Sequence, residues 1–281
     1  MTRATLNDVL PAANAHGYAV PGFVCLGWED ARAYVRAADA EAAPVILQAG
    51  PSCRAHTPLQ VLAAMFLHLA DQASVPVVAH LDHGQTLADC EEALRCGFTS
   101  VMFDGSRLPL AENIARTRAV AQLARRFGAS CEGELGFVGY AQGAASTGTD
   151  PDEVGPFVTE TGVDALAISV GNVHLQTSAG QTLDKARLAA IGRQTPVPLV
   201  IHGGSGLNLE DRQDLSAGTP VAKINVGTEL RQVFGQAVRQ TLSAQPDLFD
   251  RVSILAASEP PLTDAARKVF RQFGATGRAQ T

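Results

Sequence analysis

The sequence predicts a single α/β domain over residues 1–281, folded as a closed (β/α)8 barrel, also called a TIM barrel. Eight short runs of apolar and β-branched residues alternate along the chain with longer stretches of helical periodicity. This alternation indicates parallel βαβ units, and eight of them match a closed barrel. The length agrees, because α/β barrels of this size routinely form one domain. A doubly wound open sheet is the alternative, but it would usually carry a GxGxxG motif after an early strand, and none is present.

Each predicted strand is a short run followed in most cases by a turn residue. In chain order the eight runs are Tyr18–Cys25, Pro44–Ala49, Val75–Leu81, Ser100–Phe103, Ala129–Glu134, Ala165–Val170, Pro196–Ile201 and Val221–Val226. Helical periodicity is clearest in the five stretches Leu59–Ala70, Thr86–Cys96, Leu110–Phe127, Asp150–Thr161 and Asp184–Ile191. A helical tail of about residues 259–281, with a frayed end, is expected to complete the domain.

The composition excludes several classes of function. The chain is 46% hydrophobic and 18% charged, and its formal net charge of −6 argues against binding to nucleic acid or to anionic membranes. The first residues contain no apolar signal core, and no apolar run reaches the roughly 18 residues of a membrane span. The five cysteines include no CxxC pair and are expected to be reduced and mostly buried. We therefore expect a cytoplasmic protein that acts on a small molecule.

Polar residues and glycines follow six of the eight predicted strands. In a barrel, the carboxyl ends of all strands meet at one rim, and the loops at that rim carry the chemistry. Six such segments at one rim predict a functional site there. The segments are His80–Gly84, Phe103–Ser106, Glu132–Gly136, Gly171–His174, His202–Gly206 and Asn225–Thr228.

Three histidines at this rim predict a metal site. His83, His174 and His202 come from three different strand ends, so they can converge on one ion and leave a coordination position open, as in catalytic zinc sites. Zinc is the preferred metal, although cobalt, manganese or iron would fit the same ligands. His80 is either a core histidine or a residue that orients a ligand or an acid. The remaining histidines have no such placement.

Glycine-rich turns follow the last two strands. In barrels, these two turns often bind phosphate with backbone N–H groups and with the N-terminus of a helix. Thr228 is the candidate cap of such a helix. Two ordinary tight turns are the alternative interpretation. The candidate phosphate-binding residues are Gly203, Gly204, Ser205, Asn225, Gly227 and Thr228.

These motifs carry a resemblance to a known family. The most specific are HLDHG at 80–84, TDPDEVGPFVTETGVDALAISVGNVH at 149–174, IHGGSG at 201–206 and INVGTEL at 224–230. In this order they resemble the class II, metal-dependent ketose-bisphosphate aldolases, which include the fructose- and tagatose-bisphosphate aldolases. The resemblance covers nearly the whole chain, from Gly17 to about Phe234.

The resemblance implies a role for each motif. His83, His174 and His202 would bind a catalytic Zn²⁺, which would act as a Lewis acid and stabilise an enediolate after C3–C4 cleavage. Asp82 would be the general acid/base at the C4 oxygen or the aldehyde. Asp104 and Glu134 would hold a second or alternative divalent metal.

The glycine-rich turns would bind dihydroxyacetone phosphate, with a monovalent cation (Na⁺ or K⁺) near its phosphate. The resemblance also implies a homodimer or homotetramer. No Schiff-base lysine is required, and the lysines nearest to the predicted site are Lys185 and Lys223.

The sequence departs from the family pattern at several positions. Leu175 stands where the family has glycine after the second zinc histidine, and the run 174–180 lacks the lysine that helps to bind phosphate. The loop 136–143 lacks the acid that assists proton transfer at the donor. Val24 replaces an asparagine, and Ala49 replaces a serine. These departures predict a shifted donor or acceptor, such as a ketose monophosphate or an unphosphorylated ketose.

Two other functions fit the same residues. A metal-dependent sugar epimerase or isomerase would keep the carbon count of its substrate. A catalytically degenerate barrel would bind a sugar phosphate or zinc without turnover. The change Asp82→Ala should abolish turnover in an aldolase or an epimerase and should leave metal binding in a degenerate barrel largely unchanged.

Overall fold

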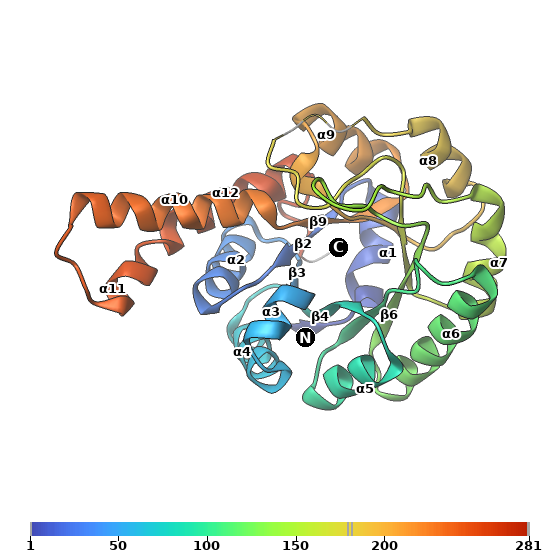
Figure 1. Ribbon diagram of the computed structural model, residues 1–281, viewed down its shortest axis with the longest axis horizontal. Coiled ribbons are helices and arrows are strands. Elements are labelled where there is room, and N and C mark those ends of the chain that lie inside the picture. Colours follow the sequence, from blue (N-terminus) through green and yellow to red (C-terminus); the bar gives the residue numbers. More distant parts are fainter. Residues whose placement is uncertain (1, 179, 181, 280–281) are drawn as a thin grey trace.

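The computed structural model describes residues 2–178, 180 and 182–279 and confirms the closed (β/α)8 barrel (Figure 1). Eight parallel strands pair in the order β4-β3-β2-β9-β8-β7-β6-β5, and pairing of β4 with β5 closes the ring. Each strand overlaps one of the eight predicted runs. The strands are β2 (Val20–Val24), β3 (Val45–Ala49), β4 (Val77–Gly84), β5 (Ser100–Phe103), β6 (Ser130–Leu135), β7 (Ala165–Ile168), β8 (Leu199–Ile201) and β9 (Val221–Val226).

Helices surround the barrel, and all five predicted helical stretches are confirmed. Thr86, Asp150 and Asp184 are the N-caps of three of them, each accepting a hydrogen bond from a backbone N–H of the first turn. The helices are α1 (Leu6–His16), α2 (Trp28–Glu41), α3 (Pro51–His56), α4 (Leu59–Gln72), α5 (Leu87–Cys96), α6 (Leu110–Arg126), α7 (Pro151–Thr161), α8 (Lys185–Gly192), α9 (Leu209–Gly218), α10 (Thr228–Ala244), α11 (Arg251–Ala256) and α12 (Glu259–Gln272), with the 3₁₀ turn η1 (Gly204–Gly206).

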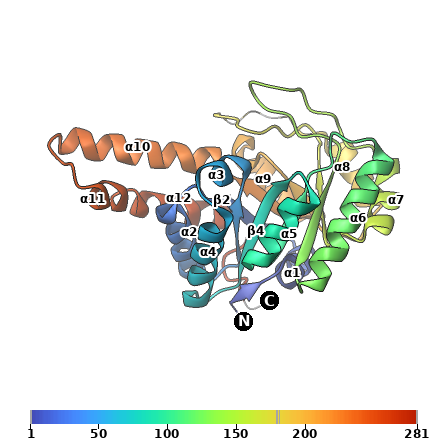
Figure 2. The same cartoon turned by 60° about the horizontal axis from the view of Figure 1, so that its bottom comes forward.

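Two N-terminal elements were not predicted. Helix α1 packs against β2, β6 and β9, so it covers the N-terminal end of the barrel. The short strand β1 (Arg3–Ala4) pairs with the start of β4 at the same end. Both termini lie there in Figure 2, while the loops after β6 and β7 extend from the opposite rim. The rim that carries the predicted site is therefore the open end.

The cysteines agree with the sequence prediction. All five are free, and four of them are buried. Within the described part of the chain, no helix combines the length and the apolar character needed to cross a bilayer.

Helices α10 and α11 project from the barrel as an arm, and α12 returns to pack against α2 (Figure 1). Phe270 of α12 meets Phe23 of β2 edge to face, with ring centroids 5.4 Å apart. Beyond α12, Gly277 and Ala279 donate backbone hydrogen bonds to the carbonyls of Glu41 and Ala42 at the end of α2. The last two residues of the predicted tail, 280 and 281, lie outside the described residues.

A buried carboxylate fixes this C-terminal segment to α2. The side chain of Glu41 accepts hydrogen bonds from Arg267 (2.8 Å) and Arg271 (2.7 Å) of α12 and from the hydroxyl of Thr276 (2.9 Å). Burial opposes its charge, but these donors hold the pKa of Glu41 below its usual value. The ionised form is therefore the one that stabilises the docked α12.

We predict that Glu41→Gln lowers the free energy of unfolding by about 2 kcal/mol at pH 7, because charge-assisted hydrogen bonds are lost. The difference should begin to shrink as the pH falls below the ordinary glutamate pKa and should be lost below the lowered pKa of Glu41, since the wild-type side chain is then neutral too. Urea unfolding at pH 7 and at several pH values from 5 down to 3 measures both effects. Glu210→Gln, at an exposed position of α9, is the control. Equal stability of Glu41→Gln and wild type at pH 7 would contradict the prediction.

Candidate active site

Strand β4 continues three residues beyond its predicted end and carries Asp82 and His83 to the open rim. Its register with β5 shifts between Leu81 and Gly84. His83 has a φ of 54°, a left-handed conformation that histidine rarely adopts. The guanidinium of Arg54 in α3 donates to the carbonyls of Asp82 and His83. These contacts hold a strained backbone that places both side chains in one cavity.

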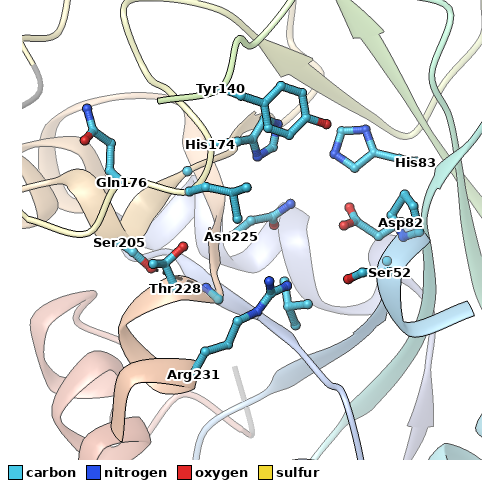
Figure 3. Close-up of a pocket in the computed structure, with 16 residues that line it drawn as sticks. Ser52, Asp82, His83, Tyr140, His174, Gln176, Ser205, Asn225, Thr228 and Arg231 are labelled. Carbon is cyan, nitrogen blue, oxygen red and sulfur yellow. Dashed lines mark hydrogen bonds between the residues drawn. The ribbon is translucent and has the colours of Figure 1, made fainter. Parts of the chain in front are cut away.

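The imidazoles of His83, His174 and His202 meet at this rim (Figure 3 labels the first two). The ring centroid of His83 lies 4.8 Å from that of His202 and 5.2 Å from that of His174. One nitrogen from each ring lies within 4.8 Å of the others. Nε2 of His174 and Nδ1 of His202 are buried without a hydrogen-bond partner. Converging nitrogens without partners fit a divalent cation that keeps an open position.

A fully buried polar network supports His202 from below. Nε2 of His202 lies 3.1 Å from Oε1 of Glu132, and the ammonium of Lys223 donates to Oε2 of the same carboxylate at 2.5 Å. Nε2 of His80 lies 3.3 Å from Nζ of Lys223, and Nδ1 of His80 lies 2.8 Å from the hydroxyl of Ser100. Because Glu132 occupies Nε2 of His202, Nδ1 is the nitrogen that remains for a metal. Among the described contacts, His80 reaches the metal group only through this network.

The two predicted carboxylate ligands form a second group around His83. Nδ1 of His83 lies 2.9 Å from Asp104 and 3.8 Å from Glu134. The three side chains offer ligand atoms within 4.8 Å of one another, and Oε2 of Glu134 is buried without a partner. The structure therefore brings all five predicted metal ligands together, with His83 shared between the two groups.

The rim has an excess of negative charge. Burial opposes the charge of Asp82, but neighbours such as His83 hold its pKa below the usual value. Burial alone would lower the pKa of His83, yet Asp82 and Asp104 raise it to about 10. Burial, together with the charge of Asp104, raises the pKa of Glu134 to about 8. In the metal-free protein, protons on His83 and Glu134 offset part of this charge, and a divalent ion would displace them.

A cavity of about 260 Å³ opens between the histidines and the glycine-rich turns (Figure 3). Asp82 lines it, and the side chain of Gln48 donates a 3.0 Å hydrogen bond to one of its oxygens. Five of the six predicted phosphate-binding residues also line it: Gly203, Ser205, Asn225, Gly227 and Thr228. The sixth, Gly204, is buried against β9, where a Cβ would come within 2.5 Å of Ile224.

The helix start beside the cavity differs from the prediction in one respect. Thr228 is the first residue of α10 and not its cap, and the N-cap position belongs to Gly227. The hydroxyl oxygen of Ser205 accepts hydrogen bonds from the backbone N–H groups of Gly227 (3.3 Å) and Glu229 (3.2 Å). Ser205 therefore satisfies the helix terminus from another loop, which spacing along the sequence could not reveal.

Several cavity residues were not predicted: Ser52, Tyr140, Gln176 and Arg231. Tyr140, in the loop after β6, stacks on His174 with ring centroids 5.1 Å apart. Leu175, named as a departure, lines the cavity with a φ of 59°, so it keeps a left-handed conformation that favours glycine. These residues lie on loops and a first helical turn, where periodicity carries no signal. For Arg231 the sequence offered one indication of a place in the cavity, because this residue directly follows the INVGTEL motif.

Comparisons with known proteins agree with this geometry. Residues 4–278 match the family model "Fructose-bisphosphate aldolase class-II". A protein of Bacillus subtilis (strain 168) named "Probable fructose-bisphosphate aldolase" is 36% identical, over 99% of this chain and 100% of its own length.

Solved structures show the same similarity. The YdjI aldolase of Escherichia coli K12 is 28% identical, with a TM-score of 0.87 over 99% of this chain and 100% of that one. A "putative fructose-1,6-biphosphate aldolase" from Coccidioides immitis is 26% identical, with a TM-score of 0.83 over 98% of each chain.

We predict that Glu132→Gln weakens divalent-metal binding by about 10- to 100-fold, because the carboxylate that orients His202 is lost. Competition with a chromophoric chelator measures the affinity. The change also leaves the buried Lys223 without a counter-charge, so Glu132→Gln/Lys223→Met serves as the companion variant. It should recover thermal stability without recovering metal affinity. Wild-type affinity in either variant would show that Glu132 does not orient the ligand.

Proposed function

The chain belongs to the class II fructose-bisphosphate aldolase family and is a lyase of the aldolase type; on that premise, we propose that it is zinc-dependent and uses dihydroxyacetone phosphate or a similar ketone as its donor. One observation carries the proposal. Three histidines from three strand ends converge with two buried, unpartnered nitrogens beside Asp82. Three histidines with an open position are the ligand set of a catalytic zinc site.

Each part of the cavity has a proposed role. A zinc ion held by the histidines would supply Lewis acidity toward the donor carbonyl. Asp82 moves the proton at the C4 oxygen of the ketose, which becomes the aldehyde oxygen. Gln48 fixes one oxygen of Asp82 and leaves the other toward Gly50 at the cavity wall. The positive charge of the bound ion would keep Asp82 ionised and ready to accept that proton.

The glycine-rich turns bind the donor phosphate. The oxygen of Ser205 already accepts two backbone hydrogen bonds, so its hydroxyl proton remains to donate into the cavity. Gly203 has a φ of 72°, and a Cβ there would lie 2.2 Å from the carbonyl oxygen of Val173. A glycine is required for this close approach. A monovalent cation near the phosphate belongs to the same proposal.

We propose that the substrate differs from fructose 1,6-bisphosphate and is a ketose monophosphate or an unphosphorylated ketose. Among the described residues that line the cavity there is no lysine, and Asp82 is the only carboxylate. The lysine and the loop acid of the family pattern are therefore both missing from the described lining of the cavity. Cleavage of fructose 1,6-bisphosphate at the efficiency of a dedicated enzyme would contradict this proposal.

Further parts of the proposal rest on the resemblance. Asp104 and Glu134 would hold a second or alternative divalent metal with His83, which the second ligand group supports. A homodimer or homotetramer and a cytoplasmic location complete it. Membership in the aldolase family does not favour either alternative function, namely a sugar epimerase or isomerase and a catalytically degenerate barrel.

The first test is deuterium exchange into dihydroxyacetone phosphate, followed by NMR. Metal-loaded enzyme in D₂O should exchange a proton on the carbon beside the carbonyl. A chelator should stop the exchange, and added zinc should restore it. This measurement reads the donor half-reaction without a known aldehyde. Absence of exchange from enzyme shown to contain metal would exclude dihydroxyacetone phosphate as the donor.

We predict that Asp82→Asn slows carbon–carbon bond formation between dihydroxyacetone phosphate and glyceraldehyde by at least about 100-fold, because the general acid/base is lost. The amide oxygen keeps the hydrogen bond from Gln48, so zinc content should stay at the wild-type level. Asp247→Asn, at an exposed position, is the control. Full activity of Asp82→Asn would remove Asp82 from the mechanism.

A further inference from the structure

His174 is the proposed metal ligand that no strand places directly. Strand β7 ends at Ile168, six residues before it, whereas His83 lies within β4 and His202 directly follows β8. In the described part of the chain, no hydrogen bond reaches the imidazole of His174, and its Nε2 is buried without a partner. The position of this ligand must therefore come from contacts outside its own strand.

The loop that follows β6 supplies these contacts to the backbone of His174. Within this β6 loop (residues 137–147), the carbonyl of Gly139 accepts a 2.8 Å hydrogen bond from the N–H of His174. The N–H of Ala141 donates in turn to the carbonyl of His174 at 3.0 Å. The two bonds form a parallel bridge between His174 and Tyr140. Both backbone polar groups of the ligand are thus bound to one loop.

The side chain of Tyr140 extends this contact to the imidazole. Its ring stacks on that of His174, with centroids 5.1 Å apart and planes tilted by 28° (Figure 3). Aromatic pairs at this separation attract each other beyond the effect of the apolar area that they bury. The other aromatic neighbours of His174 among the described residues are the proposed ligands His83 and His202. Tyr140 is therefore the ring that can orient His174 independently of the ligand group itself.

The β6 loop is anchored at its base and at its turn. Phe137 and Thr147 exchange two backbone hydrogen bonds of 2.8 Å, and the guanidinium of Arg107 lies 4.3 Å from the ring centroid of Phe137. Near the turn, the N–H of Tyr140 donates to the carbonyl of Ala144 at 3.0 Å. Because its backbone is already ordered, Tyr140 can hold a neighbouring ring at little further cost in conformational entropy.

We propose that the ring of Tyr140 positions His174 for metal binding, and that the β6 loop serves to hold this ligand in place. The loop that lacks the family's acid thus has a different task. Tyr140 acts through His174 and takes no part in proton transfer. The inference rests on the proposed function for the identity of the ion.

Zinc affinity, measured by competition with a chromophoric chelator, tests the inference. Tyr140→Phe keeps the ring and should bind zinc within about twofold of wild type. Tyr140→Leu keeps an apolar side chain but loses the aromatic contact, so it should bind zinc about 3- to 10-fold more weakly. Cobalt(II) bound to Tyr140→Leu should show an altered visible absorption spectrum, because a displaced imidazole changes the coordination geometry. Tyr140→Phe should keep the wild-type spectrum.

Gln142→Leu is the matched control, because Gln142 lies in the same loop at an exposed position. It should keep the zinc affinity and the cobalt spectrum of wild type. Thermal unfolding of the metal-free proteins checks that each variant is folded.

Three results would overturn the inference. Tyr140→Leu could bind zinc as tightly as wild type does. Equal weakening in Tyr140→Phe would assign the effect to the hydroxyl, and equal weakening in Gln142→Leu would make it a general property of the loop. If zinc affinity depends on the ring but the enzyme catalyses no exchange into dihydroxyacetone phosphate, the proposed donor fails while this inference stands. Chelator-sensitive exchange by an enzyme whose zinc affinity is indifferent to Tyr140 would be the converse.

Discussion

Glu132 and Lys223 form an ion pair inside the barrel, where neither side chain has exposed surface. Either charge alone would cost several kcal/mol in this interior, so each is tolerated only because the other is present. One carboxylate oxygen meets the ammonium and the other meets Nε2 of His202. The orientation of the imidazole thus follows from the charge balance beneath it. Closing the barrel brings β6, β8 and β9 close enough for this arrangement.

The second constraint is the backbone at the end of β4. The register shift and the left-handed φ of His83 are unfavourable locally. They persist because Arg54 binds the carbonyls of Ala49, Asp82 and His83 from one guanidinium. A single surface helix, α3, therefore sets where both the proposed acid/base and a proposed metal ligand point. The buried pair of Glu132 and Lys223 orients His202, and Arg54 holds the backbone of His83. Two of the three histidines are therefore fixed independently of each other.

The sequence was sufficient to predict the barrel, its eight strands and the converging ligands, because short apolar and β-branched runs and polar strand ends are local signals. It also contained Glu132, which precedes Glu134 by two residues and so shares its face of the strand. Other features depend on three-dimensional contacts. Capping of α10 by Ser205 joins two loops, and α1 covers the barrel base through contacts with three separate strands. The inward placement of Lys223 follows only once Glu132 is known to face it.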